Sequence, residues 1–342
     1  MNWPVFSVII PARNEEKVIA QTIKTILNVN YPKDRLEIFV VIDGSLDKTA
    51  EIARQFKKVI IVEEKEPRKC KGDALNAVLP LTKGEIIAII DADVKISKNA
   101  FKAIAKRFRD KNIAAATGPC LSYRTNTFVS RIVSVETSLY NFIQRILSKF
   151  NLDAHLHGGN LYVRKSDLIA VGGFDTETML EDWELSLKIK QKLNKKIIFE
   201  PKAVAWQSEP PTISAFWGQR YRWARGTLKV AKKYKKICFQ YLLHGFPYYS
   251  APFSLALNFG LFSYILFSSF KILDFVVLPA LLIFLFYFCF AFAAKLTNHE
   301  NLRDIAYIPL WFCFCWIEFF IAAKAFIDEK KKVEFKWFKT PR

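Results

Sequence analysis

The sequence predicts an α/β domain with a mostly parallel mixed sheet, followed by apolar helices long enough to cross a membrane. Three observations support this prediction. Short apolar segments alternate with helix-like segments over roughly the first 110 residues. Polar residues follow several of the apolar segments, at the points where the strands of such a sheet end. Beyond residue 235 the chain becomes strongly apolar and aromatic, which explains a mean hydropathy of +0.11 in a chain that is 24% charged.

Each strand is predicted from a short apolar run, and each helix from a longer segment next to such a run. Strands are expected at residues 5–10, 36–42, 58–62 and 85–90. Helices are expected at residues 16–29, 47–56, 73–79 and 99–110. Short buried strands separated by helices indicate a mostly parallel sheet that is covered on both sides.

Three apolar stretches in the C-terminal part are each close to the ~20 residues that a membrane-spanning helix needs. They cover residues 249–270, 275–294 and 305–327. Glu318 interrupts the third stretch. A charged group at membrane depth is costly, so Glu318 is expected either to face other helices or a cavity, or to lie at the interface on a tilted helix.

The 342-residue chain has a formal net charge of +19, and its densest lysine runs, at 229–236 and 330–342, flank the apolar stretches. Such flanks mark the cytoplasmic side and attract anionic lipids, so nucleic-acid binding is a minor hypothesis. Three crossings would separate the two runs, which leaves the number of crossings open. The N-terminus lacks a basic signal-peptide region. We expect a cytosolic globular domain at 1–235, interfacial and transmembrane helices at 236–328 and a basic tail at 329–342, in a multi-pass cell-membrane protein.

Two carboxylates, Asp91 and Asp93, follow the strand predicted at 85–90. On an extended segment residues i and i+2 point to the same side, so both carboxylates face one site at a spacing of roughly 7 Å. Hard oxygen ligands suit Mg²⁺ or Mn²⁺ rather than zinc. The sequence therefore predicts a metal site here, and a solvated strand end is the alternative.

Seven motifs occur in order along the first 226 residues. They are Ser-Val-Ile-Ile-Pro-Ala-Arg-Asn-Glu (7–15), Val-Ile-Asp-Gly-Ser-Leu-Asp-Lys-Thr (41–49), Lys-Gly-Asp-Ala-Leu-Asn (71–76), Asp-Ala-Asp (91–93), Gly-Gly-Phe-Asp (172–175), Glu-Asp-Trp (181–183) and Gln-Arg-Tyr-Arg-Trp (219–223). Their order and spacing resemble glycosyltransferase family 2, whose members have a nucleotide-sugar-binding α/β fold called GT-A.

The resemblance implies a donor site at the strand ends. Pro11, Arg13, Glu15 and Asp43 would line the nucleotide base and ribose, with Asp43 accepting a hydrogen bond from the uracil N–H. The family usually has a second aspartate where this chain has Ile42. A turn followed by a helix cap is the alternative role for the aspartates at 43 and 47.

The resemblance also implies roles for the diphosphate-binding groups. Lys71 would lie near the donor diphosphate, although a solvated basic loop is its alternative. Asp93 would hold the Mg²⁺ or Mn²⁺ ion, and Asp91 would contact the ion or the ribose. The bound ion would neutralise the charge that builds on the departing nucleoside diphosphate.

Asp182 is the candidate catalytic base, because its Glu181-Asp182 pair resembles the T-E-D motif of the family at the start of a helix. Leu180 replaces the threonine of that motif, so the local capping interaction is expected to differ. His155 and His157 form a second candidate pair, for a metal ion or for packing and acceptor contact.

The Gln-Arg-Tyr-Arg-Trp motif resembles the Q-x-x-R-W signature of cellulose, chitin and hyaluronan synthases. The resemblance implies that Trp223 stacks on the acceptor sugar and that Gln219 and Arg222 contact acceptor or diphosphate oxygens. An interfacial membrane anchor is the alternative role of this helix.

These motifs together predict an inverting, metal-dependent glycosyltransferase that moves a sugar from a nucleotide-sugar, expected to be a UDP-sugar, to a lipid or polysaccharide acceptor at the membrane. The sequence leaves two possibilities within this class, a processive polysaccharide synthase and a transferase that adds one sugar to a lipid. A membrane protein that binds nucleotide-sugars without catalysis is the alternative from another class.

Overall fold

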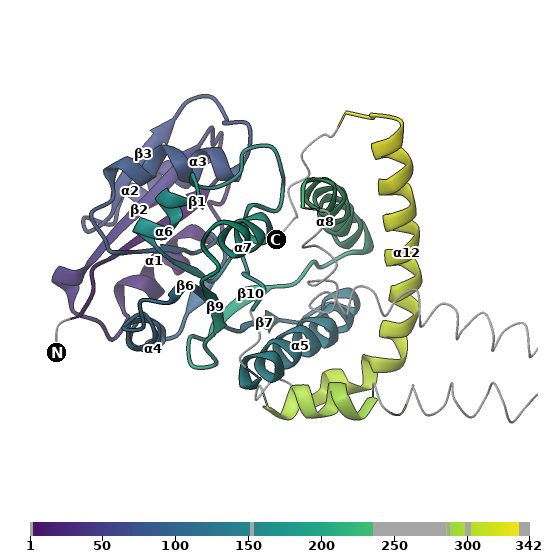
Figure 1. Ribbon diagram of the computed structural model, residues 1–342. Coiled ribbons are helices and arrows are strands. Elements are labelled where there is room, and N and C mark those ends of the chain that lie inside the picture. The colour runs from purple at the N-terminus through teal and green to yellow at the C-terminus, as the bar shows by residue number, and fades with distance from the viewer. Residues whose placement is uncertain (1–2, 151–153, 235–284, 286–287, 298–301, 335–342) are drawn as a thin grey trace, which may run out of the picture. The chain divides into compact units, whose positions relative to one another are not determined.

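The computed structural model describes residues 3–150, 154–234, 285, 288–297 and 302–334. The chain forms two compact units. The first comprises Met1–Cys120, Gln144–Ser208 and Lys229–Cys238, and the second comprises Leu121–Ile143, Glu209–Leu228 and Phe239–Arg342. Both units are therefore assembled from segments that are far apart in the sequence, and two long helices each contribute to both units (Figure 1).

The first unit is built on a seven-stranded sheet with the order β3-β2-β1-β4-β8-β6-β9. These strands are β1 (Phe6–Ala12), β2 (Leu36–Asp43), β3 (Ile60–Glu64), β4 (Ile86–Ile89), β6 (Ile113–Thr117), β8 (Leu161–Arg164) and β9 (Lys196–Phe199). Strand β8 runs antiparallel to β4 and β6, whereas β1–β2, β1–β4, β2–β3 and β6–β9 are parallel pairs. The predicted mostly parallel mixed sheet is confirmed.

The register of the central strands places their carboxyl ends at one edge of the sheet. Phe6 pairs with Leu36 on β2 and with Ile86 on β4. Because these three strands are parallel and start in step, the polar segments that follow them emerge side by side. The predicted convergence of strand ends is therefore present in the fold.

Helices cover both faces of this sheet, as the alternation of apolar residues along β1 requires. They are α1 (Ile19–Leu27), α2 (Thr49–Arg54), α3 (Lys71–Val78), α4 (Ala100–Arg107), α6 (Lys165–Ala170) and α7 (Glu181–Leu193). Phe6, Val8 and Ile10 pack in one buried cluster together with Phe101 of α4. Ile9 points to the opposite face and packs in a second cluster, which includes side chains of α3, α6 and α7.

The eight elements predicted from the sequence are all present, each within three residues of its expected bounds. The helix expected at 16–29 begins only at Ile19, because the preceding residues form a turn in which the Val18 N–H donates to the Glu15 carbonyl at 3.0 Å. The short strand β5 (Lys95–Ile96) pairs antiparallel with β10 (Ala205–Ser208).

The second unit contains mainly helices. Its described elements include parts of α5 (Phe128–Lys149) and α8 (Ile213–Lys233), most of β7 (Cys120–Arg124), a helix at Phe288–Thr297, η4 (Leu302–Tyr307) and α12 (Ile308–Lys330). Ile132 of α5, Phe216 of α8 and Phe314 of α12 pack in one buried cluster. Helices α5, α8 and α12 therefore share a core.

Within the described residues no single helix is both long enough and apolar enough to span a bilayer. The segments Arg303–Trp311 and Cys313–Lys330, which meet at a bend of 49°, satisfy the length and composition criteria only as a pair. The expected stretch at 249–270 lies outside the described residues. The stretch at 275–294 is described only at Leu285 and from residue 288 onward.

Glu318 lies on α12 and pairs with Arg220 of α8, with its Oε1 at 3.0 Å from Arg220 Nε. Its side chain is 13% exposed. Of the two interpretations of this residue, the one in which Glu318 faces another helix is therefore confirmed.

Candidate active site

Asp91 and Asp93 lie in a tight turn after β4. The Val94 N–H donates to the Asp91 carbonyl at 3.0 Å, which closes the turn. The extended geometry expected for this segment is wrong, because the chain turns directly after the strand. The two carboxylates consequently differ in exposure: the Asp91 side chain is 34% exposed, whereas Asp93 is 7% exposed.

Lys71, at the start of α3, joins two of the predicted acidic groups. Its Nζ lies 2.8 Å from Asp91 Oδ1 and 2.9 Å from Glu181 Oε1. Burial alone would lower the pKa of the Lys71 ammonium, but Asp91, Glu181 and Asp182 together outweigh it and raise that pKa. Burial raises the pKa of Glu181, and Lys71 opposes this effect. Lys71 is therefore charged, and the solvated-loop interpretation of it is wrong.

Asp182 lies in the first turn of α7, with both carboxylate oxygens held by backbone amides. Its Oδ2 accepts the Gly158 N–H at 2.7 Å, and its Oδ1 accepts the Trp183 N–H at 2.7 Å. No side chain caps this helix at Leu180, as the replacement of threonine predicts.

The loop 157–159, which precedes β8, contributes residues that the sequence analysis missed. A Cβ atom at Gly158 would lie 3.0 Å from Asp182 Oδ2 and 3.0 Å from Lys71 Nζ. A Cβ atom at Gly159 would lie 3.3 Å from Asp91 Oδ2. The glycines therefore let the backbone approach both acidic groups, and the Gly-Gly dipeptide was the available signal for this loop.

The two histidines of this region have local roles in the structure. The His155 ring lies edge-on to Trp183, with the ring centroids 6.0 Å apart. His157 Nδ1 accepts the Gly159 N–H at 3.2 Å. Across the described part of the chain, no three His, Cys, Asp or Glu side chains are grouped to hold a metal ion. The packing interpretation is therefore favoured for His155, and His157 shapes the loop.

The acidic groups at this strand end fit a magnesium or manganese ion by the chemistry of their donor atoms. Asp91 and Asp93 offer hard carboxylate oxygens, and Mg²⁺ commonly takes one or two carboxylates and completes its shell with substrate phosphates and water. A site with only two protein ligands matches this pattern.

The expected nucleotide-binding segments lie at the ends of β1 and β2 and are tied together. Pro11 lies within β1. Asn14, which stands between Arg13 and Glu15 in the sequence, accepts the Leu46 N–H on its Oδ1 at 2.7 Å. Asp43, 8% exposed, ends β2 and accepts the Arg68 N–H on Oδ1 at 2.8 Å.

Asp47 lies in the same region and serves as a local cap. Its Oδ1 accepts the Thr49 N–H at 3.0 Å at the start of α2, and its Oδ2 accepts the Glu16 N–H at 3.1 Å. Asp47 thus bonds the first backbone amide of α2, as the alternative interpretation expects, although the cap position itself is Lys48. Asp43 instead accepts a backbone N–H from Arg68, which is distant from it in the sequence.

The candidate acceptor residues Gln219, Arg222 and Trp223 lie on α8, in the second unit. Arg220 organises two of them, because its guanidinium lies over the Trp223 ring, 4.2 Å from the centroid, and its Nη1 donates to Gln219 Oε1 at 2.9 Å. Arg220 also pairs with Glu136 at 2.7 Å. The sequence analysis did not single out Arg220, which lies between the motif residues.

Comparison with known proteins agrees with the resemblance in the motifs. Residues 7–172 match the family model described as "Glycosyl transferase family 2". The chain is 31% identical over 368 residues to the "Probable glycosyltransferase YdaM" of Bacillus subtilis (strain 168), and the alignment covers 99% of this chain and 87% of that protein.

Two further relatives are similar over about two thirds of the chain. One is the "Beta-monoglucosyldiacylglycerol synthase" of Nostoc sp. (strain PCC 7120 / SAG 25.82 / UTEX 2576), 32% identical over 65% of this chain and 49% of its own length. The other is the "Poly-beta-1,6-N-acetyl-D-glucosamine synthase" of Staphylococcus epidermidis, 31% identical over 66% of this chain and 55% of its own length. The alignments thus span about half the length of these two relatives.

Among solved structures, the chain is similar to the "Mannosyltransferase PcManGT from Pyrobaculum calidifontis in complex with GDP-Man and Mn2+". The TM-score is 0.60 at 20% identity, over 98% of this chain and 89% of that one, which supports a GT-A-like fold. The near full-length similarity to a glycosyltransferase and the match to the family model lead to one conclusion: the chain belongs to glycosyltransferase family 2.

Proposed function

We propose that this enzyme is an inverting, metal-dependent transferase that moves a sugar from a UDP-sugar to a lipid or polysaccharide acceptor at the membrane. The observation that carries the proposal is the cluster in which Lys71 bridges Asp91 and Glu181 while Asp182 lies against the adjacent loop at Gly158. One cluster thus contains a candidate cation-binding carboxylate, a candidate diphosphate-binding cation and a candidate base.

Asp182 accepts the proton of the acceptor hydroxyl in this proposal. The bond from the acceptor oxygen to the anomeric carbon forms as the bond to the nucleoside diphosphate breaks, and the leaving group departs with its electron pair. Each carboxylate oxygen has two acceptor positions, so Asp182 can take this proton while the Gly158 and Trp183 amides fix its orientation.

Lys71, Asp91 and Asp93 serve the departing diphosphate. The Lys71 ammonium, held between Asp91 and Glu181, provides positive charge beside the phosphates. Asp91 and Asp93 would hold Mg²⁺ or Mn²⁺, which supplies charge neutralisation to the leaving group when bound.

The donor base and ribose bind along Pro11, Arg13, Glu15 and Asp43. The Arg68 N–H orients the Asp43 carboxylate, whose second oxygen can accept the uracil N–H. Gln219, Arg222 and Trp223 bind the acceptor. The identification of uracil depends on the Asp43 side chain alone, since the Ile42 side chain forms no hydrogen bonds.

The proposed membrane attachment rests on composition and on one structural feature. The bent pair in η4 and α12 is long and apolar enough, taken together, to enter a bilayer. We therefore propose a catalytic domain at 1–235 in the cytosol, interfacial and transmembrane helices at 236–328 and a basic tail at 329–342. The relatives named for a glucolipid and for a polysaccharide support the two acceptor classes equally.

The test is a donor screen with the purified full chain and Mn²⁺ or Mg²⁺. Mass analysis of lipid and soluble products identifies the acceptor class, and NMR of the first product gives its anomeric configuration. We expect transfer from a UDP-sugar with inversion, loss of transfer on chelation and recovery on adding Mn²⁺. Retention of configuration would refute the single-displacement mechanism, and a product with one added sugar would exclude chain extension.

A further inference from the structure

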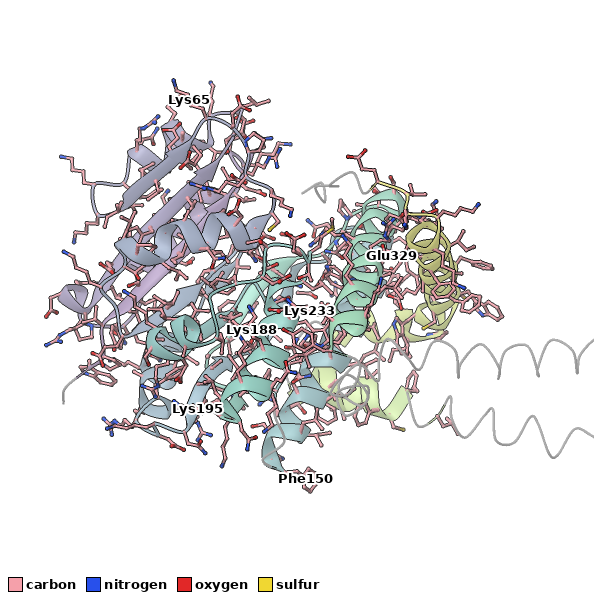
Figure 2. All side chains as sticks on the ribbon, turned by 45° about the horizontal axis from the view of Figure 1, so that its top comes forward. Lys65, Phe150, Lys188, Lys195, Lys233 and Glu329 are labelled. Atoms are coloured by element: carbon pink, nitrogen blue, oxygen red, sulfur yellow. The ribbon has the colours of Figure 1, made fainter. Side chains whose placement is uncertain are left out.

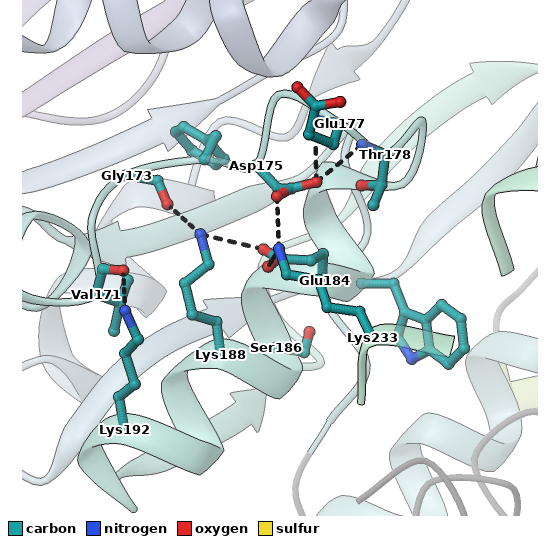
Figure 3. A network of polar contacts seen from close by, with 12 residues as sticks. Val171, Gly173, Asp175, Glu177, Thr178, Glu184, Ser186, Lys188, Lys192 and Lys233 are labelled. Carbon is teal, nitrogen blue, oxygen red and sulfur yellow. Dashed lines mark hydrogen bonds and ion pairs between the residues drawn. The ribbon is translucent and has the colours of Figure 1, made fainter. Parts of the chain in front are cut away.

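The first turn of α7 carries a third acidic side chain besides Glu181 and Asp182, namely Glu184, which is fully buried. Its Oε1 accepts a hydrogen bond from Lys233 Nζ at 2.8 Å (Figure 3). The same oxygen accepts a hydrogen bond from the Tyr234 hydroxyl. Lys188 Nζ lies 3.2 Å from its Oε2. A buried carboxylate is stable in the folded protein only when it is paired and hydrogen-bonded, so these three donors hold Glu184 in place.

Lys233 also holds the loop that leads into α7. Its Nζ lies 2.6 Å from Asp175 Oδ1, while Asp175 Oδ2 accepts the Thr178 N–H at 2.8 Å. The neighbouring ammonium of Lys188 donates to the Gly173 carbonyl at 2.9 Å. Lys188 and Lys233 lie side by side in both stick views (Figures 2 and 3). One cation at the end of α8 thus ties together the start of α7 and the loop before it.

The same loop contacts the helix that begins with Lys71. Asn76 of α3 donates to the Phe174 carbonyl and accepts the Phe174 N–H, both at 2.8 Å. A Cβ atom at Gly72 would lie 2.1 Å from the Asp175 carbonyl oxygen. The loop is therefore held both by α3, whose first residue is Lys71, and by Lys233, which also contacts Glu184 in the helical turn that carries Asp182.

Lys233 belongs to the lysine run that the sequence assigned to the membrane flank. Its contacts are instead internal to the first unit, on Asp175 and Glu184. Both Lys233 and its neighbour Lys232 are exposed, but Lys232 has no ion pair with any residue that the structure describes. Charge pattern alone does not distinguish these two lysines, but their contacts do.

We propose that Lys233 and Tyr234 are positioning residues for Asp182, and that they act through Glu184. Glu184 and Asp182 share the first turn of α7, so a displacement of one moves the other. Fixing Glu184 keeps the Asp182 carboxylate at its hydrogen bond with Gly158. This inference rests on the proposed role of Asp182 as the base.

The experiment compares turnover and donor KM of the full-length variants Lys233→Met, Lys233→Arg and Tyr234→Phe, with Lys232→Met as the matched control. Lys233→Met is expected to lower kcat about 10- to 100-fold at unchanged donor KM, as a small misplacement of a reacting group does. Lys233→Arg should recover most of this loss, because arginine can reach the same two carboxylates. Tyr234→Phe should lower kcat in the same direction, and Lys232→Met should retain it.

A second comparison separates positioning from general destabilisation. In an Asp182→Asn background, adding Lys233→Met should produce no further fall in the residual rate, because both changes remove the same function. An independent, multiplicative loss would overturn the inference, as would full kcat in both Lys233→Met and Tyr234→Phe. If Lys233→Met does not fold, Tyr234→Phe provides the same comparison.

The two proposals fail in different ways. Full turnover of Asp182→Asn would refute the assigned base itself. An inactive Asp182→Asn together with a fully active Lys233→Met would refute only the positioning role.

Discussion

The substitution Gly158→Ala tests the geometry of the active-site cluster most sharply. The added methyl carbon would lie 3.0 Å from Asp182 Oδ2 and 3.0 Å from Lys71 Nζ, whereas ordinary contacts begin at 3.4 Å. Both polar atoms must therefore retreat by about 0.4 Å, and the 2.7 Å hydrogen bond from the Gly158 N–H to Asp182 is lost or stretched. A hydrogen bond to a charged group contributes about 1.5–3 kcal/mol.

This energy corresponds to a fall in kcat of about 10- to 100-fold, since ~1.4 kcal/mol is tenfold in rate. The assay is transfer from labelled donor, with donor affinity measured separately by calorimetry. Gly172→Ala is the control, because a Cβ there meets nothing within 4 Å but must adopt a φ of +91°. It should lower stability by about 1–3 kcal/mol while folded molecules keep their kcat. Wild-type kcat in Gly158→Ala would refute the proposed packing around Asp182.

Three further changes have defined outcomes. Lys71→Met should lower kcat/KM for the donor about 10- to 100-fold, because it removes a charged hydrogen bond. Lys71→Arg should be less affected. Equal values of kcat/KM for both variants and the wild type would contradict this. The pKa of Asp175 lies below its ordinary value of 3.8: burial opposes the shift, but Lys233 and the Thr178 contacts outweigh it. This ion pair therefore stabilises the fold at pH values above the unfolded pKa of Asp175, and its contribution is lost as the pH falls through the folded pKa. Asp175→Asn should flatten the acid limb of the curve of Tm against pH. An unchanged acid limb would argue against the pair. Arg220→Leu leaves Glu136 of α5 and Glu318 of α12 without their cation. This change should lower the free energy of unfolding by about 3–5 kcal/mol. An unchanged denaturation midpoint, measured in detergent, would contradict this prediction.

Local sequence patterns predicted the strands and helices of the first unit because their causes are local. Phe6, Val8 and Ile10 alternate with Ile9 along β1, and this alternation alone requires a sheet with two covered faces. The approximate position of each helix followed from the segments between such strands. The end of β4 was predicted within one residue, but the segment from Asp91 to Asp93 was treated as extended where the chain turns.

The contacts within the candidate site depend on long-range topology, which a local pattern does not contain. Strand β8 inserts antiparallel between β4 and β6, and this order brings the loop at Gly158 to the end of β4. Asp91 and Glu181 meet at Lys71 although they are far apart in the sequence. The role of Gly158 depends on its lack of a side chain. The sequence motifs identified candidate residues by the chemistry of their side chains, so they did not indicate this glycine.

Charge patterns were informative about composition but not about partners. Lys233 and Lys232 are equivalent in the sequence, yet only Lys233 reaches the buried Glu184. Glu318 interrupted an apolar stretch without an evident reason until its pairing with Arg220 was known. In both cases the missing information was the identity of the opposite charge, which packing between distant helices determines.

The central claim is that Asp182 removes the proton of the acceptor. The most direct measurement compares sugar transfer and metal-dependent donor binding in Asp182→Asn and in the wild-type chain. Transfer should fall about 10²- to 10⁴-fold, the usual contribution of a general base, while donor affinity is unchanged. Undiminished turnover in this variant would contradict the account.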